Sequence, residues 1–215
     1  MRTTYCMMMF LCLAAFSGMV QAQTDRPGNR MIAGGRDGGA AEQHTGEGAP
    51  TLDAQREKRA LAIFAKLIEK EIVSAAEAMP ADKYGFAPSA GEFKGVRTFA
   101  QQVKHLAATN HILAAAALGE PAPTSAGDEA GPETVRTKTE ILDYLKESFA
   151  HLGKAIEAIG EKSRAVKSSP ISPLPAGAET RLALTVEALV HAFDHYGQMV
   201  EYLRMNGVVP PASRS

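Results

Sequence analysis

Cysteine is scarce in this sequence. The 215 residues include only Cys6 and Cys12, so both cysteines lie close to the N-terminus. The rest of the chain therefore offers no disulfide, no cysteine nucleophile and no cysteine ligand for a metal ion. If the segment that carries both residues is removed on export, stability must come from the core or from a bound metal.

An excess of charge of either sign is also missing. Lys and Arg total 23, Asp and Glu total 24, and the formal net charge is −1 at pH 7. Nucleic acids and anionic membrane surfaces attract strongly basic proteins. We therefore expect no nucleic-acid partner, and the expected substrate or ligand is an unidentified small molecule.

The N-terminus has the features of a secretory signal peptide over residues 1–22. Arg2 precedes an apolar run from Cys6 to Val20, and the run ends in the small-x-small pattern that signal peptidase cleaves. We therefore expect an exported protein, either periplasmic or secreted. After cleavage the chain would contain no integral membrane domain.

Two alternatives compete with a cleaved signal peptide. A retained membrane anchor would need roughly 20 apolar residues, and this run is shorter. A lipoprotein signal is disfavoured because Phe10 and Leu11 precede Cys12, where a small residue is expected before a lipidated cysteine. Whether the signal is cleaved or retained stays open at this point.

A Gly-rich segment over residues 23–50 follows, with almost no large apolar side chains. Such a composition cannot bury enough surface to offset the entropy lost on ordering. We expect a flexible linker there and a folded domain over residues 51–213.

Strand-like alternation of apolar and polar residues is absent, and helical periodicity takes its place. Helices are predicted over 51–80, 96–119, 134–160 and 180–207, with Thr51 as the first N-cap and Pro80 and Gly119 as stops. Tyr84, Phe86 and Phe93 lie in the first loop and are expected to pack onto the helices. The prediction is an all-α four-helix bundle whose long connections leave room for a crossover.

The apolar spacing also predicts which side of each helix faces the core. The residues expected to point inward are Leu61, Phe64, Ile68 and Ile72 in the first helix; Phe99, Val103, Leu106 and Leu113 in the second; Ile141, Leu145, Leu152, Ile156 and Ile159 in the third; and Leu182, Val186, Leu189, Phe193 and Val200 in the fourth. In the last helix the histidines would then flank a polar stripe at the rim of the bundle.

His191 and His195 are four residues apart on the last predicted helix, so their side chains share one face. This spacing supplies two metal ligands in the zinc helix with the pattern His-Glu-x-x-His, but the catalytic Glu of that pattern is missing here. A third ligand could come from His105, His111 or His151. Helix geometry favours His105, and His151 is expected to be a solvated surface residue.

The segments FAQQVKHLAATNHILAAAALG and HAFDHYGQMVEYLRMNGVVPPAS resemble the two signature helices of the DinB-like family. The resemblance covers roughly residues 51–213 and implies a four-helix bundle with a long crossover, often as a homodimer. It also implies a metal site made by His105, His191 and His195, with Gln198 as a partner that orients a ligand. The implied cofactor is a divalent metal ion, zinc or nickel first, with iron, cobalt or manganese as further candidates.

Three functions are compatible with the sequence. The first is a metal-dependent enzyme, either a transferase resembling thiol S-transferases or a hydrolase. Export counts against the transferase, because the thiols used by those relatives are largely cytoplasmic. The second is a non-catalytic extracytoplasmic bundle that binds a metal or a small ligand. The third is a structural bundle with incidental histidines.

Overall fold

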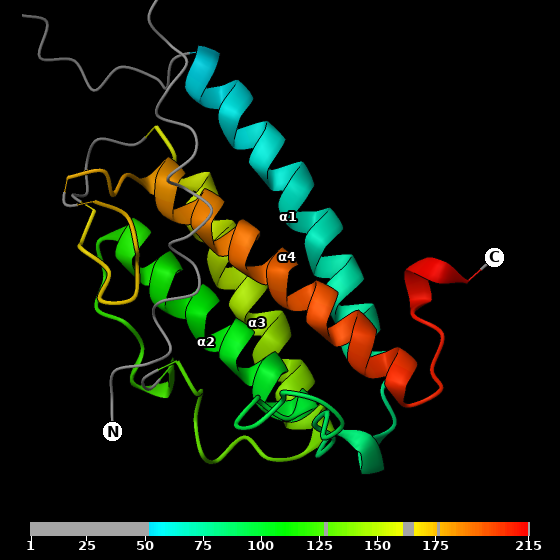
Figure 1. The fold of residues 1–215 in the computed structure, drawn as a ribbon. Coiled ribbons are helices and arrows are strands. Elements are labelled where there is room, and N and C mark those ends of the chain that lie inside the picture. The colour runs from blue at the N-terminus through cyan, green and yellow to red at the C-terminus, as the bar shows by residue number, and fades with distance from the viewer. Residues whose placement is uncertain (1–51, 127–128, 161–165, 176, 215) are drawn as a thin grey trace, which may run out of the picture. The chain divides into compact units, whose positions relative to one another are not determined.

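The computed structural model describes residues 52–126, 129–160, 166–175 and 177–214 (Figure 1). The predicted signal peptide, the linker and the Thr51 N-cap lie outside these residues. Within them the chain forms four long helices: α1 (Leu52–Ala78), α2 (Phe99–Leu118), α3 (Lys138–Glu157) and α4 (Arg181–Met205). Short 3₁₀ turns η1 (Ala81–Lys83), η2 (Thr124–Ala126) and η3 (Pro211–Ser213) lie between or after them, and the described part of the chain contains no strand.

Threonine side chains define where three of the helices begin. Thr98 and Thr137 each accept a hydrogen bond from a backbone N–H three residues later, and Gln101 and Glu140 return the bond in a capping box. Thr180 caps α4 in the same way, without the return bond. At the other end of α2, Gly119 adopts a left-handed conformation, with φ 73°, and closes the helix.

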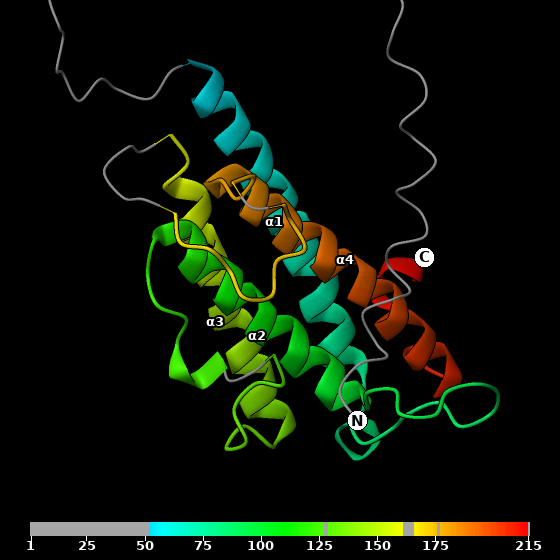
Figure 2. The same cartoon turned by 60° about the vertical axis from the view of Figure 1, so that its left-hand side comes forward.

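Contacts between helices define a bundle with a long crossover. Lys58 of α1 pairs with Glu157 and Lys146 of α3 pairs with Glu77, so these two helices are antiparallel. Between α2 and α3, Asn110 contacts Ser148 and His111 contacts His151, which makes these two parallel. The segment from Gly119 to Thr137 must therefore run back along the bundle, as Figures 1 and 2 show.

The crossover packs closely against α2. Gly131 has φ 74°, and a Cβ atom there would lie 3.3 Å from the backbone oxygen of Lys104. The close approach of the crossover, together with packing against α3 and α4, buries 17 of the 20 residues of α2. A helix that is buried on all sides is expected to be apolar all round. The alanines of α2 meet that requirement, and their small side chains allow the crossover and the neighbouring helices to pack close to α2.

The predicted core residues of the second and third helices are confirmed, since all nine are buried. In α1, the prediction for Phe64 is wrong because its side chain is 58% exposed. In the first loop, Tyr84 packs edge-on against Phe99 and Phe86 against Tyr202, whereas Phe93 remains 38% exposed.

The predicted rotation of α4 is wrong. Of the predicted core residues Leu189 is buried, but Val186 and Phe193 are 40% and 54% exposed, while Leu184 and Met199 are fully buried. The core side of α4 is centred on the small residues Ala188 and Ala192, because close contact between helices favours small side chains there. This rotation turns the histidine side of the helix inward.

No helix in the described part of the chain combines the length and apolar character needed to cross a membrane.

Candidate metal centre

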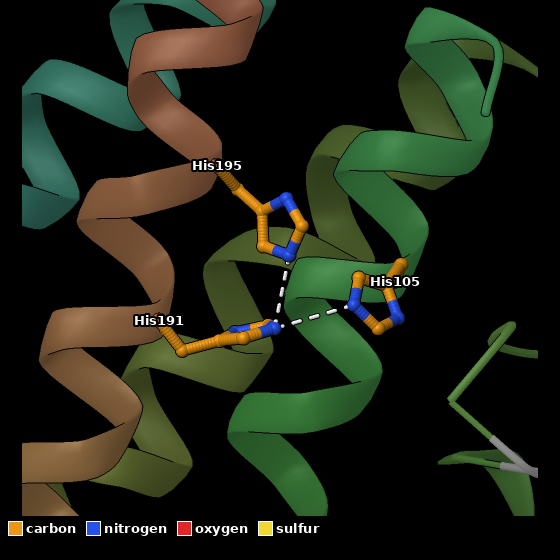
Figure 3. A group of neighbouring side chains, drawn as sticks. All are labelled: His105, His191 and His195. Atoms are coloured by element: carbon orange, nitrogen blue, oxygen red, sulfur yellow. Dashed lines mark hydrogen bonds between the residues drawn. The ribbon is translucent and has the colours of Figure 1, made fainter. Parts of the chain in front are cut away.

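Three histidines from two helices meet inside the bundle. His105 projects from α2, and His191 and His195 project from successive turns of the antiparallel helix α4 (Figure 3). The Nε2 atom of His191 lies 2.9 Å from Nε2 of His195 and 3.2 Å from Nε2 of His105. One ring nitrogen from each residue lies within 4.8 Å of the others, so the three could hold a metal ion.

The crossover fixes the orientation and tautomer of His105. The Nδ1–H of its ring donates to the backbone oxygen of Glu129 at 2.9 Å, which leaves a lone pair on Nε2 toward the other two histidines. Glu129 has φ 79°, a left-handed conformation that is unfavourable for residues other than glycine, asparagine or aspartate. Its carboxylate Oε2 also lies 3.9 Å from Nδ1.

A chain of amide side chains holds His195. The side-chain amide of Gln102, one turn before His105 on α2, contacts Nδ1 of His195 and donates to Oε1 of Gln198 at 2.8 Å. Gln198 in turn donates to the exposed carboxylate of Asp194. The Gln102 amide can present either its nitrogen or its oxygen to the histidine, and the second orientation leaves Nε2 of His195 free to bind an ion.

The protons of three neutral imidazoles satisfy this cluster poorly. His105 contributes a lone pair at Nε2, because its proton is used in the bond to Glu129. With Nδ1–H of His195 bonded to the Gln102 amide oxygen, a single Nε2–H of His191 would have to be shared between the lone pairs of His105 and His195. A cation at the centre would accept all three lone pairs at once. The residues present therefore fit a metal ion.

Burial keeps the cluster neutral. Desolvation lowers the pKa of all three rings, and the positive charge of Arg97 lowers them further. For His191, burial and the neighbouring His105 bring the pKa to about 4. Neutral imidazoles are the form that binds a metal ion, so at pH 7 few protons would have to be displaced.

The other two candidate ligands lie elsewhere. His111 of α2 and His151 of α3 form a separate pair, with 3.0 Å between their Nδ1 atoms, and His111 packs beside the Tyr144 ring. The prediction that His151 is a solvated surface residue is wrong, because the side chain is half-buried in this contact. Among the described residues this pair belongs to no group of three potential ligands.

Two residues that touch the cluster were not predicted from the sequence. Gln102 could have been found, since it lies three residues before His105 and therefore shares a helix face with it. No sequence pattern points to Glu129, because its backbone oxygen reaches the site from an irregular loop. Gln198 contacts Gln102 and does not contact a histidine directly.

The fold and the site define a crossover four-helix bundle with a candidate three-histidine metal centre. A sequence model of the DinB superfamily matches residues 66–199, which is more than half of the chain and includes all three histidines. The chain belongs to the DinB superfamily.

A comparison with solved structures finds a similar fold. The fold is similar to a crystal structure assigned to the DinB family from Exiguobacterium sibiricum, with a TM-score of 0.50 and 16% sequence identity. The match covers 74% of this chain and 95% of that chain. At this identity the likeness concerns the fold alone. No curated protein matches the chain.

Proposed function

We propose that the protein binds one divalent metal ion through Nε2 of His105, His191 and His195. The observation that carries this proposal is the convergence of three ring nitrogens that have at most one proton to share among them, where a cation would accept all three lone pairs. Zinc and nickel are the first candidates, since imidazole nitrogen suits both, and iron, cobalt and manganese follow.

Three protein ligands are typical of catalytic zinc sites, which keep a further position for water or substrate. Three neutral ligands leave the full charge of the ion, which can lower the pKa of bound water or polarise an oxygen or sulfur atom. We therefore propose a metal-dependent transferase or hydrolase acting on a small molecule. In this role Glu129 and Gln102 orient the ligand rings, and the positive charge of Arg97 favours an anionic substrate group.

The second candidate is a non-catalytic module that binds a metal or a small ligand. It is favoured by the absence of a nearby acid or base in the zinc-helix position, where Ala192 follows His191. The two candidates differ in one property: a catalytic ion keeps an exchangeable water, whereas a closed site does not. Water proton relaxation with a paramagnetic ion such as Mn²⁺ in the site distinguishes them.

Elemental mass spectrometry on untagged residues 23–215 tests the metal proposal. We expect about one divalent ion per chain in the parent protein and none in a His105→Ala, His191→Ala, His195→Ala triple variant. A His151→Gln variant is the matched control, because it removes a histidine outside the cluster and should keep the ion. Equal metal content in the parent and the triple variant, with both folded, would refute the site.

We also propose that the protein is exported through the signal peptide at residues 1–22. The support is the apolar run and the small-x-small pattern in the sequence. Fractionation of the producing cells should find the mature chain outside the cytoplasm, with an N-terminus near Gln23. A full-length chain in the cytoplasm would contradict export.

A further inference from the structure

The ring of His191 differs from the other two rings of the cluster at its second nitrogen. Nδ1 of His105 donates to the Glu129 carbonyl, and Nδ1 of His195 contacts the Gln102 amide. Nδ1 of His191 is buried, and none of the described residues forms a hydrogen bond with it. A histidine that binds a metal through Nε2 keeps its proton on Nδ1 and almost always donates it to an acceptor. The metal-loaded cluster therefore needs one more acceptor.

A buried hydroxyl on α2 is an acceptor of the required kind. Thr109 is 4% exposed, and its Oγ1 atom forms no hydrogen bond within the described part of the chain. Threonine hydroxyls in helices often bond to a carbonyl of the preceding turn, as that of Thr185 does to the Arg181 oxygen. Since the Thr109 hydroxyl does not make this bond, its oxygen is available to a donor outside its own helix.

Thr109 lies on the side of α2 that faces the histidines of α4. At about 100° per residue, its direction falls between those of Gln102 and His105. Gln102 contacts Gln198 of α4, and His105 contacts His191. These two contacts set the register of the antiparallel helices. Continued along α2, this register places Thr109 about two residues, or about 3 Å along the axis, from the level of His191.

The other buried polar atoms of α2 point away from the cluster. Oδ1 of Asn110 and Nε2 of His111 also have no hydrogen-bond partner among the described residues, but both side chains contact α3. On α4, the inward residue nearest the level of Thr109 is Ala188, which is fully buried and whose small side chain allows the helices to approach closely. Thr109 is therefore the hydroxyl placed to serve His191.

We propose that Thr109 is a positioning residue of the metal centre, whose Oγ1 accepts the Nδ1 proton of His191 when an ion is bound. The inference rests on the metal site proposed above and supplies a partner for its third ligand. The bond fixes the tautomer and the ring orientation of His191 and makes its Nε2 a more basic ligand, as the Glu129 carbonyl does for His105. Thr109 itself touches neither the ion nor a substrate.

Isothermal titration calorimetry with Zn²⁺ on residues 23–215 tests the proposal. Thr109→Val keeps the shape of the side chain and removes the oxygen, so the Zn²⁺ affinity should fall by about 10- to 100-fold. Thr109→Ser keeps the oxygen and should bind Zn²⁺ about as tightly as the parent. Thr185→Val is the matched control, because Thr185 is also buried but bonds only within α4, and it should keep the affinity of the parent.

Urea unfolding of the metal-free variants separates positioning from packing. A buried hydroxyl without a partner is unfavourable, so Thr109→Val should lose Zn²⁺ affinity without losing stability. Three results would overturn the inference and leave the metal site standing: parental affinity in Thr109→Val, a Thr109→Ser variant as weak as Thr109→Val, or a loss of affinity accompanied by a loss of stability. A folded parent that binds no Zn²⁺ would overturn the metal site and this inference together.

Discussion

At the residue scale, the candidate site depends on a backbone oxygen as much as on side chains. Glu129 holds a left-handed conformation and places its carbonyl against Nδ1 of His105. Conformations of this kind cost about 1–3 kcal/mol in residues other than glycine and persist only where the surroundings enforce them. The packing of the crossover at Gly131 is such a constraint. The loop therefore sets the direction in which His105 offers its lone pair.

This role predicts a contrast between two substitutions at position 129. Glu129→Gly keeps the carbonyl and tolerates the left-handed conformation, so Zn²⁺ affinity should stay close to that of the parent. Glu129→Val disfavours that conformation, and losing the orienting bond should weaken Zn²⁺ binding by about 10- to 100-fold. Isothermal titration calorimetry measures both. Since both variants lack the carboxylate, equal affinities would show that the backbone conformation has no part in the site.

At the element scale, α2 and α3 meet through a buried histidine pair. Burial and the neighbouring His151 lower the pKa of His111 to about 4, below its ordinary value of 6.5. The unfolded chain therefore binds more protons than the folded chain between about pH 6.5 and 4. The stabilisation is present in full above pH 6.5 and is lost as the pH falls through this range.

We predict that urea unfolding of the metal-free protein shows this pH dependence. The free energy of unfolding should fall from pH 7.5 to pH 5, and it should fall less steeply in a His111→Asn variant. The cluster histidines contribute equally to both proteins, so the difference between the two curves reports on His111. Parallel curves would contradict the assignment.

The helices also show how much of the fold could be predicted from the sequence. The four helices followed from apolar spacing and from stop signals such as Pro80 and Gly119, all of which act locally. The rotation of α4 did not, because a helical wheel weights Phe193 and Val186 by size, whereas packing selected Ala188 and Ala192. The pairing of His111 with His151 also depends on the parallel course of α2 and α3, which only the crossover determines.

At the scale of the whole molecule, the wrong core predictions fall in α1 and α4. Phe64, Val186 and Phe193 are large apolar residues, yet they are exposed on the outer side of these two helices. The histidine site was easier to anticipate, because the four-residue spacing predicts one shared face for His191 and His195 and the resemblance to the DinB-like family implies His105 as the third ligand.

The central claim is that one ion binds at Nε2 of His105, His191 and His195. The most direct measurement is anomalous X-ray diffraction from crystals of the zinc-loaded protein. We predict a single strong peak about 2.0–2.1 Å from these three nitrogens, with His105 still bonded to the Glu129 carbonyl. A peak at the His111–His151 pair, or no peak among the three histidines, would contradict the account.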